Sequence, residues 1–286
     1  MWIALAINAS MVVVEAVGGI VTGSLAVLAD AGHLLSDVGA IALGLLAAAL
    51  AARPVAGRRT FGYQRSEVLA ALANGLLLVA VAVGIAIVAI GRFGDPPGID
   101  AGGVLALGLF GLAGNVAATA VLARGEREDL NLEGVLRHSV ADALGSIGVV
   151  VAGVVVLAGG SPLVDPIVGI LIALLVLASS WHLIKEPLDV LMETAPAGID
   201  VEGVGAAICS ESGVRSVHDL HVWTVTAGFA ALAAHVVVAV DSDRDLVRRR
   251  LEVLLSERFE IEHTTLQMEE EAGEGLLEVE NASPQP

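Results

Sequence analysis

The chain has 286 residues, of which 56% are hydrophobic and only 16% charged, and its mean hydropathy is +0.80. Such a composition excludes an ordinary soluble domain of this length and favours a protein whose solvent is the lipid bilayer. The formal net charge of −17 is acidic, and acidic surfaces repel nucleic-acid phosphates and anionic lipid headgroups, so we expect no nucleic-acid partner. Cations are the favoured ligands.

Six stretches are apolar enough to cross the roughly 30 Å hydrocarbon core of a bilayer as helices. They lack the alternating pattern of barrel strands. Residues 1–20 have no basic segment and no small-residue cleavage site, so we expect the first stretch to be a retained helix and not a signal peptide. The predicted spans, which form a transmembrane domain over 1–186, are 2–22, 25–51, 66–91, 101–123, 133–158 and 163–185.

Positive charges collect in alternate connections between these spans. The loops 53–65 and 124–137 and the exit of the last span hold eight arginines and lysines, whereas the opposite loops hold only Arg92. Loops rich in arginine and lysine stay in the cytoplasm. The pattern predicts a multi-pass protein of the plasma membrane with both termini in the cytoplasm.

After Pro187 the hydropathy falls, and residues 187–269 are expected to form a water-soluble domain. The order of its elements, αββαβ, predicts a small antiparallel sheet with helices on one face. Residues 270–286 are acidic and contain Gly, Ser and Pro, so we expect disorder there. The predicted helices are 200–211 and 243–259, and the predicted strands are 214–225, 229–240 and 262–269.

Two predicted spans carry a histidine and an aspartate four residues apart, His33 with Asp37 and His138 with Asp142. This spacing places both side chains on one face of a helix, one turn apart. Each pair taken alone is equally compatible with a hydrogen bond inside its own helix. Two copies inside a membrane favour ion binding, because unpaired ionisable groups are costly there.

If the two spans pack face to face, two imidazoles and two carboxylates converge on one point. That ligand set suits tetrahedral Zn²⁺, and two carboxylates balance its charge in a medium of low dielectric constant. Without metal the site should take up protons, because histidine titrates near neutral pH. The sequence therefore predicts exchange of a divalent cation for protons.

Other polar residues fall in or near the spans and carry less specific information. They could line a hydrated path or form hydrogen bonds between helices, and for the asparagines helix packing is the favoured role. Asp30, three residues before His33, could instead orient a ligand or cap a helix. These residues are Asn8, Glu15, Asp30, Asn74, Asn115 and Asp165.

Four segments resemble the signature blocks of the cation diffusion facilitator family, and they occur in the order found in that family. They are 28–37 (LADAGHLLSD), 59–67 (RTFGYQRSE), 137–146 (RHSVADALGS) and 218–223 (HDLHVW). The resemblance covers nearly the whole chain. It implies a homodimeric antiporter with six membrane helices and a cytoplasmic ferredoxin-like α+β domain, which exports zinc and related ions in exchange for protons.

The resemblance also implies roles for individual residues. His33, Asp37, His138 and Asp142 match the transport site, and the His/Asp combination is similar to that of zinc-transporting members. In the C-terminal domain, His218, His235 and Glu269 match positions that bind regulatory metal in some relatives. From the residues alone, those histidines are equally compatible with exposed or hydrogen-bonded side chains.

Other functional classes compete with zinc export. The same fold could export chiefly cobalt, cadmium or nickel, since ligand type alone does not separate these ions. A membrane-anchored metal sensor is a further alternative. We expect no enzymatic activity, because an intramembrane metalloprotease would need a motif such as H-E-x-x-H, which the sequence lacks.

Overall fold

The computed structural model describes residues 2–54, 57–122 and 132–270. Side chains are described for these residues except 2–5, 118, 121–122 and 132–141. The predicted disordered tail therefore lies outside the described residues, apart from Glu270. The chain divides into two compact units, Met1–Leu188 and Asp189–Pro286.

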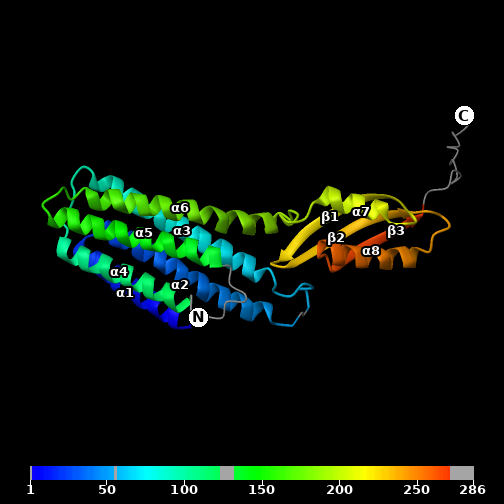
Figure 1. Ribbon diagram of the computed structural model, residues 1–286, viewed down its shortest axis with the longest axis horizontal. Coiled ribbons are helices and arrows are strands. Elements are labelled where there is room, and N and C mark those ends of the chain that lie inside the picture. Colours follow the sequence, from blue (N-terminus) through cyan, green and yellow to red (C-terminus); the bar gives the residue numbers. More distant parts are fainter. Residues whose placement is uncertain (1, 55–56, 123–131, 271–286) are drawn as a thin grey trace, which may run out of the picture. The chain divides into compact units, whose positions relative to one another are not determined.

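The first unit contains six helices lying side by side (Figure 1). Their ends fall within a residue or so of the predicted spans, except at the last helix. There the fall in hydropathy marks the end of the apolar stretch and not of the helix, which continues through Pro187. The helices are α1 (Trp2–Thr22), α2 (Leu25–Ala51), α3 (Ser66–Arg92), α4 (Ala101–Leu122), α5 (Leu132–Leu157) and α6 (Val164–Leu191).

Among the described residues, α2, α3 and α6 are long and apolar enough to cross a membrane. The other three helices contain shorter apolar stretches within the part that is described: Ala6–Thr22, Ala101–Ala117 and Asp142–Leu157. Six helices therefore form where six spans were predicted, and three of them meet the criteria of length and composition by themselves.

In the first unit, the distribution of apolar and polar side chains between surface and interior is the reverse of that in a soluble protein. Large apolar side chains such as Ile20, Ile90 and Trp181 are 64 to 71% exposed. Polar side chains are instead buried, with exposures of at most 6% for Glu15, Asp30, Asn74, Asn115 and Asp165. This distribution suits a bundle surrounded by lipid, in which polar groups face the protein interior.

Glycines allow some of these helices to approach closely. A Cβ on Gly153 of α5 would lie 2.7 Å from the backbone nitrogen of Leu105 on α4, and one on Gly108 would lie 2.9 Å from that of Val150. Gly114 of α4 similarly meets Met11 of α1. Small residues at such crossings are typical of membrane bundles, where packing replaces the hydrophobic effect between helices.

The second unit has the predicted element order αββαβ. Its three strands form one sheet in the order β1-β2-β3, and β1 and β2 form an antiparallel hairpin around Gly228, whose φ of +72° suits a residue without a Cβ. The elements are α7 (Val201–Ser210), β1 (Val214–Thr226), β2 (Phe229–Val238), α8 (Arg244–Phe259) and β3 (His263–Glu270).

The prediction of an antiparallel sheet is wrong for its last pair, because β2 and β3 are parallel. A helix, α8, connects these two strands and returns the chain to the end of the sheet where β2 begins, which makes the next strand run in the same direction. The sheet is therefore mixed.

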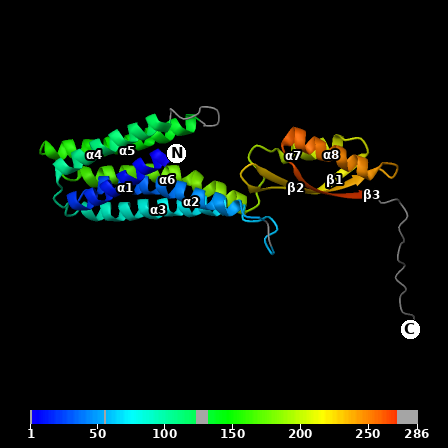
Figure 2. The same ribbon diagram turned by 90° about the horizontal axis from the view of Figure 1, so that it is seen from below.

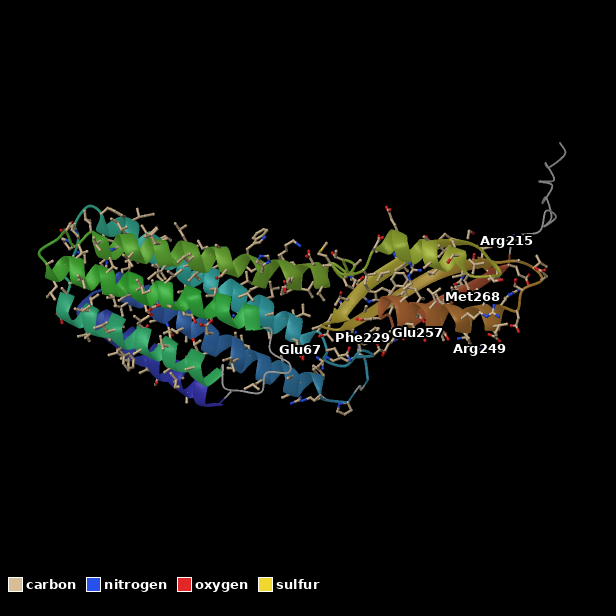
Figure 3. The ribbon with its side chains drawn as sticks, viewed as in Figure 1. Glu67, Arg215, Phe229, Arg249, Glu257 and Met268 are labelled. Carbon is tan, nitrogen blue, oxygen red and sulfur yellow. The ribbon has the colours of Figure 1, made fainter. Side chains whose placement is uncertain are left out.

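Both helices of this unit cover the same face of the sheet (Figure 2). Their buried side chains pack on alternate residues of β2, from Leu232 to Val238. The outer face of α8 carries exposed charges such as Arg249 and Glu257 (Figure 3). The other face of the sheet holds His218, His235 and Glu269, whose side chains are partly exposed.

Candidate functional site

The candidate ion site lies where α2 passes α5. His33 and Asp37 sit one turn apart on α2, and Asp142 belongs to α5. Nε2 of His33 lies 2.9 Å from Oδ1 of Asp142, although the two residues are 109 positions apart in sequence. The helices thus bring one member of each predicted pair into direct contact.

Asp37 completes a group of three possible ligands. One ligand atom from each of His33, Asp37 and Asp142 can be chosen so that all three lie within 4.8 Å of one another. The side chains of His33 and Asp142 are each 13% exposed. A nitrogen and two carboxylates this close, in a largely buried setting, can together bind a divalent cation.

His138 precedes Asp142 by one turn of α5, but its side chain lies outside those described. The fourth ligand therefore remains a prediction. The sequence left open a hydrogen bond of each histidine to the aspartate of its own pair, whereas Nε2 of His33 contacts the aspartate of the other pair, on a different helix.

Hydrogen bonds between helices surround these three residues. Oγ of Ser36 on α2 donates to Oδ1 of Asn74 on α3 at 3.2 Å. Nδ2 of Asn115 on α4 donates to Oγ of Ser146 on α5 at 3.1 Å. The packing role predicted for the asparagines is confirmed at Asn74 and Asn115. The two serine partners were not predicted, because hydroxyl residues are too common in membrane helices to stand out.

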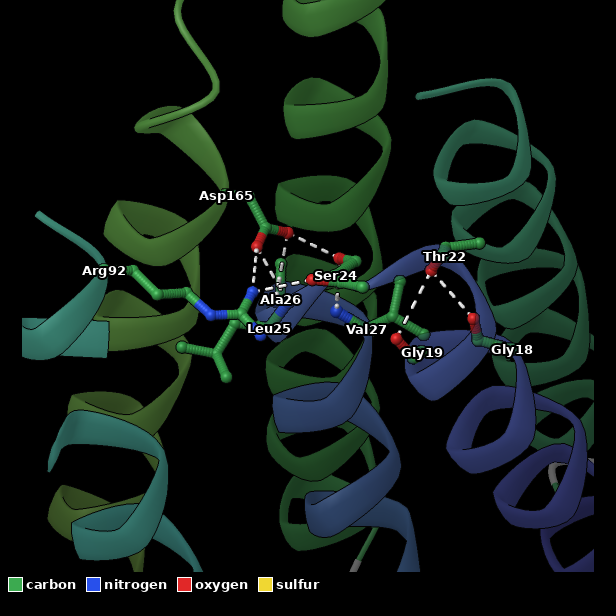
Figure 4. Close-up of polar contacts among 10 residues, drawn as sticks. Gly18, Gly19, Thr22, Ser24, Leu25, Ala26, Val27, Arg92 and Asp165 are labelled. Atoms are coloured by element: carbon green, nitrogen blue, oxygen red, sulfur yellow. Dashed lines mark hydrogen bonds and ion pairs between the residues drawn. The ribbon is translucent and has the colours of Figure 1, made fainter. Parts of the chain in front are cut away.

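Asp165 has a different role from Asp142. It lies in the first turn of α6, and its carboxylate accepts hydrogen bonds from the start of α2 (Figure 4). It thereby caps a neighbouring helix, which is one of the hydrogen-bonding roles between helices that the sequence left open.

The second cluster lies on the sheet of the second unit. His218 on β1 and His235 on β2 are direct neighbours in the strand register, and their ring centroids lie 5.0 Å apart. Glu269 on β3 joins them: its Oε2 is 3.1 Å from Nε2 of His218, and its Oε1 is 2.7 Å from Nδ1 of His235. Nε2 of Gln267 donates to Oε1 of Glu269 at 2.8 Å.

The electrostatics of this cluster follow from these contacts. The hydrogen bond to Glu269 raises the pKa of His218 above its ordinary value of 6.5. Hydrogen bonds from His235, His218 and Gln267 lower the pKa of Glu269. The ligand atoms of His218, His235 and Glu269 all lie within 4.8 Å of one another. Two imidazoles and a carboxylate with partial exposure leave room for a water ligand on a bound metal.

The match to known families covers both units. The model of the cation efflux transmembrane domain matches residues 1–192, and that of the cytoplasmic domain of cation efflux proteins matches residues 196–271. The chain belongs to the cation diffusion facilitator family. This family consists of metal transporters, so the chain is a multi-pass membrane protein whose second unit is the family's cytoplasmic domain.

Several known proteins are similar to this chain over most of their own length. The cadmium, cobalt and zinc/H(+)-K(+) antiporter of Bacillus velezensis is 38% identical over 90% of this chain and 83% of its own. The zinc transporter ZitB of Escherichia coli is 38% identical over 93% of this chain and 85% of its own. A solved metal-bound C-terminal domain of the CzcD transporter from Cupriavidus metallidurans is 38% identical over 25% of this chain and 99% of that domain, with a TM-score of 0.24.

Proposed function

We propose that this transporter exports Zn²⁺ and related divalent cations from the cytoplasm in exchange for protons. The observation that carries the proposal is the contact between His33 on α2 and Asp142 on α5, with Asp37 beside them. It joins the two repeated pairs into one group that has the ligand types of a zinc site. His138, one turn before Asp142, would supply the fourth ligand.

Proton exchange follows from the chemistry of these ligands. Zn²⁺ binds neutral imidazole and ionised carboxylate, so protons held by the empty group must leave when the ion arrives. The relatives point the same way, since one is named as an antiporter of cadmium, cobalt and zinc against H⁺ and K⁺. Zinc is the ion we favour, with cadmium and cobalt as further substrates.

Purified protein in proteoliposomes tests this function. A zinc-sensitive dye inside the vesicles should report uptake when the lumen is more acidic than the bath, and a pH dye should report the opposite flow of protons. Asp37→Asn and Asp142→Asn should each abolish both signals, because the remaining ligands cannot balance the charge of the ion.

Asp95→Asn is the matched control, since Asp95 is exposed in the connection between α3 and α4. It should exchange like the wild type. Undiminished exchange in Asp37→Asn and Asp142→Asn, with both proteins folded, would exclude this site. A metal panel of zinc, cadmium, cobalt and nickel in the same vesicles ranks the substrates.

We further propose that both termini face the cytoplasm of the cell, in the plasma membrane, as the distribution of arginine predicts. The chain contains one cysteine, Cys209, and it is exposed in the second unit. A membrane-impermeant maleimide should therefore label Cys209 only after the inner face of the membrane is opened. Labelling of intact spheroplasts would reverse the orientation.

The cluster of His218, His235 and Glu269 supports a second metal site with a regulatory role, in a homodimer formed through the cytoplasmic domains. In the double variant Asp37→Asn/Asp142→Asn, residual zinc binding should depend on His218. Replacing exposed His221, which lies outside the cluster, serves as the control. Equal zinc binding by His218→Ala and His221→Ala would exclude the regulatory site.

A further inference from the structure

Another polar cluster lies among the helices of the first unit, about one helix turn from the proposed metal ligands. It consists of Glu15 on α1, Asp30 on α2, Asn115 on α4 and Ser146 on α5. All four residues are at most 6% exposed. Four different helices thus direct polar side chains to one place in a bundle whose outer surface is apolar.

The hydrogen bonds in this cluster have a direction. Nδ2 of Asn115 donates to Oγ of Ser146, and Oγ of Ser146 donates in turn to Oδ2 of Asp30 at 3.0 Å. Asp30 therefore accepts a hydrogen bond as an ionised carboxylate would. Such a bond stabilises the charged form of a buried carboxyl group.

Glu15 lacks any comparable support. It is 1% exposed, and neither of its carboxyl oxygens has a hydrogen-bond partner among the described residues. Its Oε1 points into the cluster: a Cβ built on Gly111 of α4 would lie 2.5 Å from Oε1 of Glu15, 3.2 Å from Oγ of Ser146 and 3.6 Å from Oδ2 of Asp30. The glycine leaves room for these three oxygens to surround one point.

Two carboxyl groups this close, away from water, cannot both carry a charge without a bound cation. Among the described side chains, Asp30 is the charged neighbour that acts on Glu15, and α4, which packs on α1, contains no titratable residue. Asp30 also experiences the charges of His33, Asp37 and Asp142. The atoms with which these four residues could bind a metal ion are oxygens, so a proton suits the cluster better than zinc, which prefers nitrogen or sulfur in addition.

We propose that Glu15 and Asp30 form a proton-binding site that is separate from the metal ligands and holds one proton between them, on Glu15. This site would supply an exchanged proton beyond those displaced from the metal ligands. The inference rests on the proposed metal-for-proton exchange, and deepens it by naming a place where a coupled proton is carried.

The two sites are joined through the same pair of helices. On α2, Asp30 precedes His33 by three residues, and on α5, Ser146 follows Asp142 by four. The contact between His33 and Asp142 and the contact between Asp30 and Ser146 therefore join α2 to α5 at successive helix turns. A divalent ion bound by His33 and Asp142 adds positive charge near Asp30, which favours release of the proton from the carboxyl pair.

Transport in proteoliposomes separates this site from the metal site. Glu15→Gln keeps the shape of the side chain but fixes it in an uncharged form. Zinc uptake driven by a pH gradient should fall by about tenfold, a coupling of ordinary size between two sites. Exchange of radioactive zinc for zinc at equal pH, which needs no net proton movement, should stay within about threefold of the wild type.

Infrared spectroscopy of the same protein gives a readout other than transport. The wild type at neutral pH should show the carbonyl stretch of a protonated carboxyl group, and that band should be missing in Glu15→Gln. Glu202→Gln is the matched control, because Glu202 is exposed in the first turn of α7. It should leave the band and both modes of transport unchanged.

Each other outcome counts against the proposal. Unchanged pH-driven uptake in Glu15→Gln, or equal loss of uptake and zinc–zinc exchange, would overturn it. Uptake by the wild type that requires potassium, and loses that requirement in Glu15→Gln, would replace the proton by a monovalent metal ion. A wild type without any zinc exchange would instead overturn the proposed function itself. Asp142→Asn, measured in the same series, gives the signal expected without transport, with which the wild type is compared.

Discussion

The side chains of Ser24 and Asp165 lie 2.5 Å apart, and together they hold the first turn of α2 (Figure 4). Oδ2 of Asp165 accepts the backbone N–H of Leu25 at 2.7 Å, and Oγ of Ser24 accepts that of Val27 at 3.2 Å. The first N–H groups of a helix have no partner inside it, and a carboxylate also complements the helix dipole. Asp165 thus fixes the start of the helix that carries His33.

Asp165→Asn should destabilise the first unit by about 2 kcal/mol, because a charge-assisted hydrogen bond to buried donors is lost while the side chain keeps its size. Arg92, whose Nη1 lies 3.5 Å from Oδ2 of Asp165, would also lose its countercharge. Thermal unfolding in detergent measures the change. Asp95→Asn, in an exposed loop, should have the midpoint of the wild type, and an equal midpoint for Asp165→Asn would show that the cap contributes no stability.

His33→Asp should change the choice of metal more than the rate of exchange. Replacing an imidazole by a carboxylate removes a nitrogen ligand and adds negative charge, which favours harder ions that prefer oxygen. We expect zinc to lose about tenfold in preference against manganese, and the ratio of cadmium to zinc uptake to change as well. Competition between metals in proteoliposomes provides the measurement.

His221→Asp, at an exposed histidine of the second unit, is the control for that experiment. Its metal preference should match the wild type. If His33→Asp also keeps the wild-type order of metals, His33 does not ligate the transported ion.

The cluster on the sheet predicts a dependence of stability on pH. The raised pKa of His218 gives a contribution that is complete below 6.5 and is lost as the pH rises through the pKa of the folded state. The lowered pKa of Glu269 gives a contribution that is complete above 4.5 and is lost as the pH falls through its folded-state pKa. Both contributions are present together between pH 4.5 and 6.5.

Denaturant unfolding followed by the fluorescence of Trp223, in a protein whose Trp2 and Trp181 are replaced by phenylalanine, tests this window. The difference in stability between wild type and His218→Ala should be largest between pH 4.5 and 6.5 and shrink on either side. Taking the difference cancels groups that titrate in both proteins. His221→Ala should show no such window, and a difference that keeps growing above neutral pH would contradict the sign of the His218 shift.

Periodic patterns in the sequence were enough to predict most of the fold. The apolar stretches located the six helices, and the αββαβ order of the second unit was confirmed element by element. The parallel pairing of β2 with β3 was missed, because alternation along His263–Glu270 shows which residues share a face but not the direction of the neighbouring strand. That direction depends on how α8 crosses the sheet.

Only part of the candidate site could be predicted from the sequence. Spacing by four residues placed His33 beside Asp37, but the contact of His33 with Asp142 depends on the packing of α2 on α5, which no local pattern encodes. For Asp165 and Glu15 the sequence predicts only a place in or near the spans, with a hydrated path or hydrogen bonds between helices as alternative roles. Asp165 contacts Ser24 at the start of α2, and Glu15 lies near Asp30 of α2, so only the three-dimensional arrangement distinguishes a helix cap from a pair of carboxyl groups.

Close packing of α4 on α5 should be essential, because α5 carries Asp142. Gly153→Ala would place a Cβ 2.7 Å from the backbone nitrogen of Leu105 and 2.9 Å from its Cα. Backbone atoms cannot yield as a side chain can, so the two helices must separate, and we expect a loss of about 2 kcal/mol of stability together with slower metal exchange.

Gly84→Ala on α3 is the matched control for this prediction. A Cβ there meets nothing within 4 Å, so the substitution should be neutral or should stabilise the helix by up to about 1 kcal/mol. Thermal unfolding and zinc uptake measured on both variants give the comparison. Equal stability of the two alanine variants would mean that α4 and α5 adjust without loss, and that the position of Asp142 does not depend on their close contact.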